Sequence, residues 1–215
     1  MIHQQRIQVR FSKRGTLKFI GHNDMLRAFE SLFRRAKLPI AVSGGFHPKV
    51  KMSFPSALAL GFEGLDEVCE ITMAESAPPL SAEEVLADLN RNSVPGLTFL
   101  SARILGENEK KARLVSSVFQ AVIPEALRQQ TAVQIKNFLA ETTVIVSKTK
   151  GRHVDVRNSV ADLTFSESTG ALSAELLTQA GPEAGIKEVL TVLGLEAELF
   201  ITIFPARIKC RLAAG

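Results

Sequence analysis

The chain has 215 residues, of which 46% are hydrophobic and 22% are charged, and these values are typical of a globular protein. This length accommodates one large domain or two domains of about 100 residues each. The first residues lack the apolar run of a signal peptide, and no stretch of about 18 apolar residues is present to span a membrane. We therefore expect a cytoplasmic protein with no membrane-bound part.

The net charge of +4 conceals a strong asymmetry along the chain. Residues 1–51 contain eleven lysines and arginines and two acidic residues, a net charge of +9, whereas the remainder carries −5. A basic segment of this kind favours RNA, another polyanion or an acidic protein surface as the partner. The chain has neither Trp nor Tyr, so any side chain that stacks on bases has to be Phe or His.

Two cysteines and the absence of several motifs narrow the possible chemistry. Cys69 and Cys210 are too few for a disulfide framework, and each lies in an alternating apolar stretch that predicts burial. No CxxC, HExxH or clustered Cys/His spacing indicates a metal site. A P-loop, GxGxxG and GxSxG are also missing. We expect no metal ion and no cofactor.

The first half of the chain mixes strand and helix patterns. Arg6–Arg14 alternates apolar and polar residues, which predicts a half-buried strand with a basic outer face, and Thr16–Ile20 continues it as extended chain. A helix capped by Asn23 or Asp24 follows, with one apolar stripe that reaches Ala36. Further elements are predicted as strands at Ile40–Val42, Lys51–Leu60, Glu67–Met73 and Leu97–Leu105, and as a helix from the capping box Ser81–Glu84 to about Asn92.

The second half follows the same predicted plan after the polar linker Gly106–Lys111. A helix runs from Pro124 to about Ala140, and a shorter one covers Ile186–Leu193. The predicted strands are Leu114–Ile123, Thr143–Lys148, Arg152–Val156, Ala161–Phe165, Leu172–Leu176 and a final strand Ala197–Leu212, in which Arg207, Lys209 and Arg211 share a face.

The order strand, helix, strand, strand, helix, strand is typical of a ferredoxin-like split βαβ unit. We therefore predict an α+β protein made of two tandem ferredoxin-like sandwiches. The basic N-terminal domain covers residues 1–108, and the C-terminal domain covers residues 109–215.

The glycine-bearing turn Ser43–Pro48, followed by Lys49-Val50-Lys51, is the main candidate for a binding site. Backbone N–H groups at Gly44 and Gly45 can hold an anion, with the side chains of His47, Lys49 and Lys51 beside them. The alternative interpretation is an ordinary turn between strands. Arg10, Arg14, Arg34 and Arg35 are further candidates for anion or nucleic-acid binding, and for these the alternative is a solvated strand or helix face.

His22 is a candidate general base because it lies at a predicted helix start. The positive end of the helix dipole favours the neutral imidazole. Together with Lys49 or Lys51, His22 could form a metal-independent ribonuclease site, in which the imidazole takes a 2′-hydroxyl proton and the lysine stabilises the phosphorane. The alternative is a capping or surface histidine with no catalytic role.

Several of these motifs resemble those of a known bacterial family. Gly21-His22, Ser43–Pro48 and Leu58–Gly61 resemble the amino-terminal signature of the radical-SAM-linked protein family, and KTKGRHVDVRNSVADL and GPEAGIKEVLTVLGL are similar to its second half. The resemblance implies a partner, a cobalamin-binding radical-SAM protein that is fused to such domains or encoded beside them. It implies no catalytic residue. This chain lacks the three closely spaced cysteines that a radical-SAM cluster needs, so the partner would perform the chemistry.

A second resemblance is to the repeat-processing ribonucleases of CRISPR systems, which pair two ferredoxin-like domains and often place a histidine near the first helix. His22 matches that placement. The chain departs from the pattern because Ala206–Ala214 contains no glycine, whereas those enzymes have a glycine-rich loop near the carboxyl end.

Three functions are therefore expected as alternatives. The first is a non-catalytic accessory module that binds RNA or an acidic partner surface for a radical-SAM enzyme. The second is a metal-independent endoribonuclease that uses His22 as the general base. The third is a purely structural interaction protein whose basic surface serves solubility.

Overall fold

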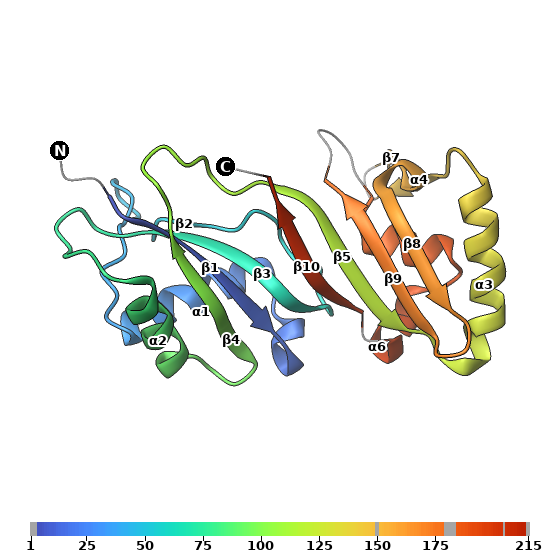
Figure 1. Ribbon diagram of the computed structural model, residues 1–215, viewed down its shortest axis with the longest axis horizontal. Coiled ribbons are helices and arrows are strands. Elements are labelled where there is room, and N and C mark those ends of the chain that lie inside the picture. Colours follow the sequence, from blue (N-terminus) through green and yellow to red (C-terminus); the bar gives the residue numbers. More distant parts are fainter. Residues whose placement is uncertain (1–3, 149–150, 179–183, 204, 214–215) are drawn as a thin grey trace. The chain divides into compact units, whose positions relative to one another are not determined.

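The computed structural model describes residues 4–148, 151–178, 184–203 and 205–213 (Figure 1). The protein has a mixed α and β fold in which antiparallel strands predominate. It divides into two compact units. The N-terminal unit contains the described residues up to Arg113 together with Ala213, and the C-terminal unit contains Leu114–Leu212.

The N-terminal unit contains four strands in the order β4-β1-β3-β2, and every pair in this set is antiparallel. Strand β1 pairs with both β3 and β4, so it lies inside the sheet. The bounds are Arg6–Lys13 for β1, Met52–Ser53 for β2, Glu63–Thr72 for β3 and Leu97–Ile104 for β4.

Helices α1 (His22–Arg35) and α2 (Ala82–Asn92) contribute to the apolar core of this unit. The core contains alternate residues of β1, including Phe11, and aromatic rings from several elements meet at Phe29. The ring centroids of Phe11 and Phe29 are 5.1 Å apart, and those of Phe29 and Phe99 are 5.6 Å apart. Burying each such side chain contributes roughly 1.5–3 kcal/mol, so this cluster anchors α1 on the sheet.

The N-terminal cap was predicted correctly for α2 but not for α1. The capping box at Ser81 is confirmed, because the Glu84 N–H donates to Ser81 Oγ at 3.1 Å and the Ser81 N–H donates to Glu84 Oε2 at 2.8 Å. Helix α1 begins earlier than predicted, with Gly21 as its N-cap and Asn23 and Asp24 inside the first turn. Gly21 adopts an extended conformation and has no capping side chain, so the usual polar signal of a helix N-cap is absent at this position.

Three further predictions in this unit were wrong in part. Residues Gly15–Phe19 form a 3-10 helix, η1, because Gly15 turns the chain at a φ of +62°. Ile40–Val42 makes only isolated bridges, Ile40 to Met73 and Val42 to Val50. Of the extended stretch predicted at Lys51–Leu60, only β2 is paired. Short apolar runs do not show by themselves whether they find a pairing partner.

In the described part of the C-terminal unit, the larger sheet has four strands in the order β10-β5-β9-β8, and all of these pairs are antiparallel. Its helix α3 (Glu125–Ala140) confirms the prediction at Pro124 to Ala140. The other elements are β5 (Leu114–Val122), β6 (Ile145–Lys148), β7 (Arg152–Asp155), α4 (Val156–Ser159), β8 (Val160–Ser166), β9 (Ala171–Leu177), α5 (Ile186–Val192) and β10 (Ala206–Leu212), and β6 pairs with β7 in a separate two-stranded sheet.

The predicted final strand was wrong in its first half. Residues Ala197–Leu199 form the 3-10 helix η3, and Phe200–Ile203 form α6, so only β10 is extended. An apolar run of this length fits a helix as well as a strand. Arg207 is buried while Lys209 and Arg211 are exposed, because a register shift separates Arg207 from Lys209. The predicted shared basic face is therefore incomplete.

The structure also bears on the two cysteines and on membrane-spanning helices. Cys69 and Cys210 are both buried free cysteines, as their alternating surroundings predicted. Burial raises the pKa of the Cys69 thiol, so this thiol stays protonated in the core. Among the described residues, no helix has the length and apolar character needed to cross a membrane.

Candidate nucleic-acid interface and the His22 pocket

The basic loop, residues Ser43–Lys51, is closed at its base by hydrogen bonds from backbone N–H groups. The Ser43 N–H donates to the Lys49 carbonyl at 2.8 Å, and the Lys49 N–H donates to Ser43 Oγ at 3.0 Å. The Lys51 N–H donates to the Ala41 carbonyl at 2.7 Å, and the Lys51 carbonyl accepts from the Thr72 N–H of β3 at 3.0 Å. The loop therefore leaves the sheet at a defined position.

The tip of the basic loop is exposed along its whole length. Gly45 has a φ of +106°, which only glycine adopts at low cost, and it turns the chain before Phe46. The Phe46 side chain is fully exposed, with a relative accessibility of 102%, and His47 next to it is exposed as well. Lys49 and Lys51 are exposed, and no ion pair joins either of them to another described residue.

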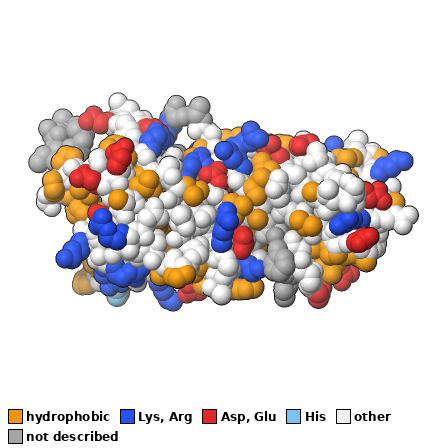
Figure 2. Space-filling model, turned by 60° about the horizontal axis from the view of Figure 1, so that its bottom comes forward, with side chains coloured by type: hydrophobic (Ala, Val, Ile, Leu, Met, Phe, Trp, Pro, Cys, Tyr) orange, Lys and Arg blue, Asp and Glu red, His pale blue; other side chains and the backbone are white. Residues whose placement is uncertain are grey.

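The arginines at the end of α1 are also exposed. Arg34 has no described ion-pair partner, whereas Arg35 donates through Nη2 to the Asn92 carbonyl at 2.9 Å. The guanidinium of Arg35 remains positively charged in this contact because a carbonyl does not neutralise it. Figure 2 shows lysine and arginine side chains close together on the N-terminal unit, at lower left, beside a histidine.

The arginines of β1 are in a different situation. Arg10 Nη1 lies 2.6 Å from both carboxylate oxygens of Asp66 on β3. Arg6 donates to Glu70 Oε2 at 3.2 Å and to the Glu109 carbonyl at 2.6 Å. We call Arg6 and Arg10 the β1 row. Arg14, which follows β1, is exposed, and its backbone N–H donates to the Gly96 carbonyl at 2.8 Å.

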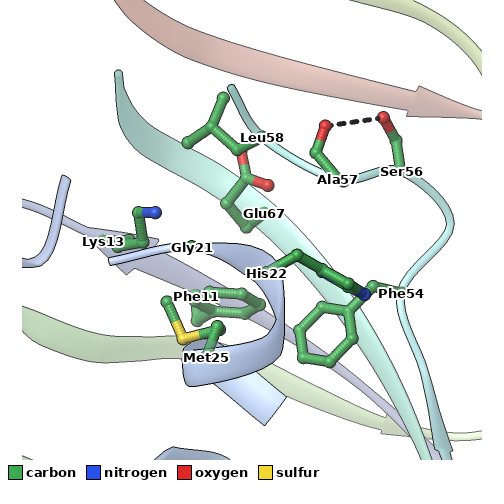
Figure 3. A pocket seen from close by; sticks show the side chains of 10 residues that line it. All are labelled: Phe11, Lys13, Gly21, His22, Met25, Phe54, Ser56, Ala57, Leu58 and Glu67. Atoms are coloured by element: carbon green, nitrogen blue, oxygen red, sulfur yellow. Dashed lines mark hydrogen bonds between the residues drawn. The ribbon is translucent and has the colours of Figure 1, made fainter. Parts of the chain in front are cut away.

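His22, the first residue of α1, lies at a pocket that is partly open to solvent. The pocket encloses about 330 Å³ of space, including the open part. The His22 ring meets the Phe54 ring edge-on, with centroids 5.6 Å apart. Figure 3 shows these side chains, and the residues that line the pocket are Phe11, Lys13, Gly21, His22, Met25, Phe54, Ser56, Ala57, Leu58 and Glu67.

Two charged side chains in this pocket were not among the predicted site residues. Lys13 at the end of β1 is 4% exposed, and Glu67 on β3 is 5% exposed. Lys13 Nζ donates to the Ile20 carbonyl at 3.3 Å. Both lie in the period-two pattern of apolar residues, Lys13 two residues after Phe11 and Glu67 two residues before Cys69. That register was the available signal for their burial.

Neither Lys49 nor Lys51, the two lysines that were predicted to act with His22, lines the His22 pocket. The pocket does contain Phe54, which lies three residues after Lys51 in the chain and meets the His22 ring. The joint action of His22 with Lys49 or Lys51 therefore stays a prediction.

No metal centre is found within the part of the chain that the structure describes, because no three His, Cys, Asp or Glu side chains are grouped to hold an ion.

The comparison with known families matches the chain over residues 6–187 to a family described as an uncharacterized protein conserved in bacteria (DUF2344). A search of curated proteins finds no match.

Proposed function

The chain belongs to the DUF2344 family of proteins conserved in bacteria, and on this premise we propose that it is an accessory, non-catalytic module that binds RNA in the cytoplasm. The observation that carries the proposal is the basic loop, whose two lysines are exposed and unpaired among the described residues. Lysines that are not neutralised by the protein can displace the counterions of a phosphate backbone, and this release drives binding.

The choice of RNA over an acidic protein surface depends on the composition of the basic loop. The loop combines Lys49 and Lys51 with two exposed rings, Phe46 and His47. Proteins that bind single-stranded nucleic acids use this combination of cations and aromatic side chains. Arg34 and Arg35 extend the same positive character to the end of α1.

Fluorescence anisotropy with labelled RNA at two salt concentrations tests this proposal. We expect binding at low salt, and we expect each phosphate contact to contribute about −0.7 to the slope of log K against log salt. Failure to bind RNA at low salt would remove the proposal. If an acidic protein fragment competes with RNA for the same loop, the protein-docking alternative replaces it.

The partner in this proposal is a cobalamin-binding radical-SAM protein. The support is the resemblance carried by Gly21-His22, Ser43–Pro48 and Leu58–Gly61, together with the two widely separated buried cysteines, which suit no iron–sulfur cluster. In this arrangement the module presents RNA and the radical-SAM protein performs the reaction. Affinity purification from a bacterium that encodes both proteins should recover the radical-SAM protein, and repeated failure to recover it would argue against the partnership.

We also propose that both units are ferredoxin-like sandwiches in tandem. The strand orders β4-β1-β3-β2 and β10-β5-β9-β8 support this proposal, because in each of these four-stranded sets the first and third strands in chain order lie side by side in the middle. In both units a helix follows the first strand. An experimental structure with a different strand order in either unit would contradict it.

A second candidate function, a metal-independent endoribonuclease, is favoured by one observation. His22 lines a pocket that is also lined by Lys13. In such a reaction the imidazole accepts the 2′-hydroxyl proton, the 2′-oxygen bonds to the adjacent phosphorus, and the 5′-oxygen leaves as it gains a proton. The products are a 2′,3′-cyclic phosphate and a free 5′-hydroxyl.

Incubation of the purified protein with RNA in EDTA tests the ribonuclease candidate. Cleavage that persists in EDTA, and that is lost in His22→Ala but retained in His153→Ala, would support it. His153 is a suitable control because it is an exposed histidine on β7 in the other unit. Equal cleavage by His22→Ala and the wild type would eliminate His22 as the base.

A further inference from the structure

Phe46 is the most exposed of the large apolar side chains that the structure describes as exposed. Its relative accessibility is 102%, whereas the next highest, Val122, has 61%. Most of the other phenylalanines in the N-terminal unit serve its core, as Phe11 and Phe29 do. A phenylalanine ring that contacts nothing gains no burial energy, so its position in the folded unit has no explanation in stability.

The basic loop holds this ring away from the fold. The two hydrogen bonds between Ser43 and Lys49 and the bridge between Val42 and Val50 close the loop below its tip. The positive φ of Gly45 then turns the chain immediately before Phe46. Because the base is held, the ring is presented without a large ordering cost at the moment of binding.

We infer that the basic loop recognises single-stranded RNA, with an unpaired base stacked on Phe46 and the flanking phosphates at Lys49 and Lys51. This inference rests on the proposed RNA-binding function. Stacking requires an accessible base face, and in a duplex both faces of each internal base are covered by its neighbours. A loop that bound RNA only through its lysines would not distinguish single-stranded RNA from a duplex by the accessibility of its base faces.

A membrane surface is the other partner to which an exposed phenylalanine beside lysines is suited, but the loop favours RNA. Membrane-surface segments present a broad apolar face together with their cations. The tip of the basic loop, residues 44–48, presents one large apolar ring, and its neighbours are His47, Pro48 and two glycines. Anionic vesicles are therefore included in the test as the competing outcome.

The variant Phe46→Trp provides a direct probe, because the chain contains no other Trp and no Tyr. Its fluorescence reports on position 46 alone. We expect an oligoribonucleotide of about twelve nucleotides to quench this emission. The same sequence annealed to its complement should quench weakly and bind at least about fivefold more weakly, because its base faces are covered.

The matched variant Phe46→Leu keeps an apolar side chain and removes the aromatic ring. We expect it to bind the single strand about tenfold more weakly than the wild type, and to bind the duplex as the wild type does. Because residue 46 is fully exposed, neither substitution should change the thermal unfolding midpoint.

Three results separate this inference from the proposed function. Equal affinity for single strand and duplex, with Phe46→Leu unchanged, would overturn the stacking role while RNA binding by the lysines stands. No binding of the single strand by the wild type at low salt would overturn both. A blue shift in the emission of the Phe46→Trp variant with phosphatidylserine vesicles, without quenching by RNA, would identify a membrane as the partner and overturn the inference.

Discussion

The β1 row and the basic loop carry the same kind of charge but differ in what surrounds it. Arg10 of the β1 row lies 2.6 Å from both oxygens of Asp66, and Arg6 bonds to the buried Glu70. Lys49 and Lys51 of the basic loop are exposed with no described ion-pair partner. The β1 row therefore contributes mainly to the stability of the N-terminal unit, and the loop leaves its charge available to a ligand.

This difference shows why the +9 charge of residues 1–51 overstates the surface that can bind a polyanion. The carboxylates that occupy the β1 row come from β3, more than fifty residues later in the chain. A local charge count cannot include them. Arg10, one of the predicted binding residues, is occupied in this way, while Arg14, Arg34 and the loop lysines remain exposed.

The largest effect is expected from Glu70→Ala, which removes the acceptor at the centre of the β1 row's network. Glu70 is 5% exposed and accepts from Arg6, from Gln8 Nε2 at 3.3 Å and from the Ala112 N–H at 2.9 Å. The substitution leaves these donors without their acceptor, and we expect a loss of about 3 kcal/mol in the free energy of unfolding. Urea denaturation measures it.

The control for that experiment is Glu75→Ala, which removes an exposed carboxylate between β3 and α2. It should change the free energy of unfolding by less than about 0.5 kcal/mol. If both variants lose the same stability, the contacts of Glu70 are not the reason for its effect.

A smaller effect is expected when Arg10→Ala is compared with Lys49→Ala. Each substitution removes one positive charge, but Arg10→Ala also removes the guanidinium that pairs with the carboxylate of Asp66, whose side chain is 14% exposed. We expect a loss of about 1.5 kcal/mol for Arg10→Ala and less than about 0.5 kcal/mol for Lys49→Ala. Thermal and urea unfolding at one ionic strength measure both losses, and equal losses would contradict the difference in surroundings between the β1 row and the basic loop.

Lys37→Gly should increase stability, because Lys37 adopts an unfavourable backbone conformation. It follows α1 with a φ of +53°, in the left-handed region where a side chain carries a cost that glycine avoids. We expect a gain of about 1 kcal/mol in the free energy of unfolding. Lys37→Ala retains the Cβ atom and the same cost, so a gain of equal size in that variant would refute the backbone explanation.

The smallest effect concerns pH. A hydrogen bond from Arg103 and, to a smaller extent, one from the Gly106 N–H lower the pKa of Glu109 below its usual range. The ionised carboxylate therefore contributes stability above the pKa of the unfolded chain, and this contribution is lost as the pH falls through the lower folded value. The difference in urea midpoint between the wild type and Glu109→Gln should be present at pH 7 and shrink toward pH 3. A difference that does not change over this range would contradict the assignment.

Local patterns in the sequence predicted much of the secondary structure. The alternation of Arg6–Arg14 and the apolar stripe of α1 both correspond to observed elements, and the Ser81–Glu84 capping box forms both of its hydrogen bonds. These signals depend on residues that are close together in the chain, so they can be recognised in a single sequence. The η1 turn and the α6 helix were missed because short apolar runs fit several conformations.

The candidate sites were less predictable because they depend on contacts between distant residues. The glycines and lysines of the basic loop were visible in the sequence, but the full exposure of Phe46 was not. The His22 pocket brings Lys13 and Glu67 together with Phe54, and these residues come from separate elements. No spacing rule predicts which strand register places two charged side chains beside a helix start.

The salt dependence of single-stranded RNA binding by three proteins, measured by anisotropy, tests whether the basic loop is the binding site. These are the wild type, Lys49→Ala/Lys51→Ala, and the charge-matched control Lys110→Ala/Lys111→Ala, whose lysines are exposed in the same unit. We predict that the loop variant binds roughly tenfold more weakly and that its slope is smaller in magnitude by about 1.4, two phosphate contacts, while the control binds like the wild type. Equal weakening of the two variants would contradict the claim that the basic loop is the binding site.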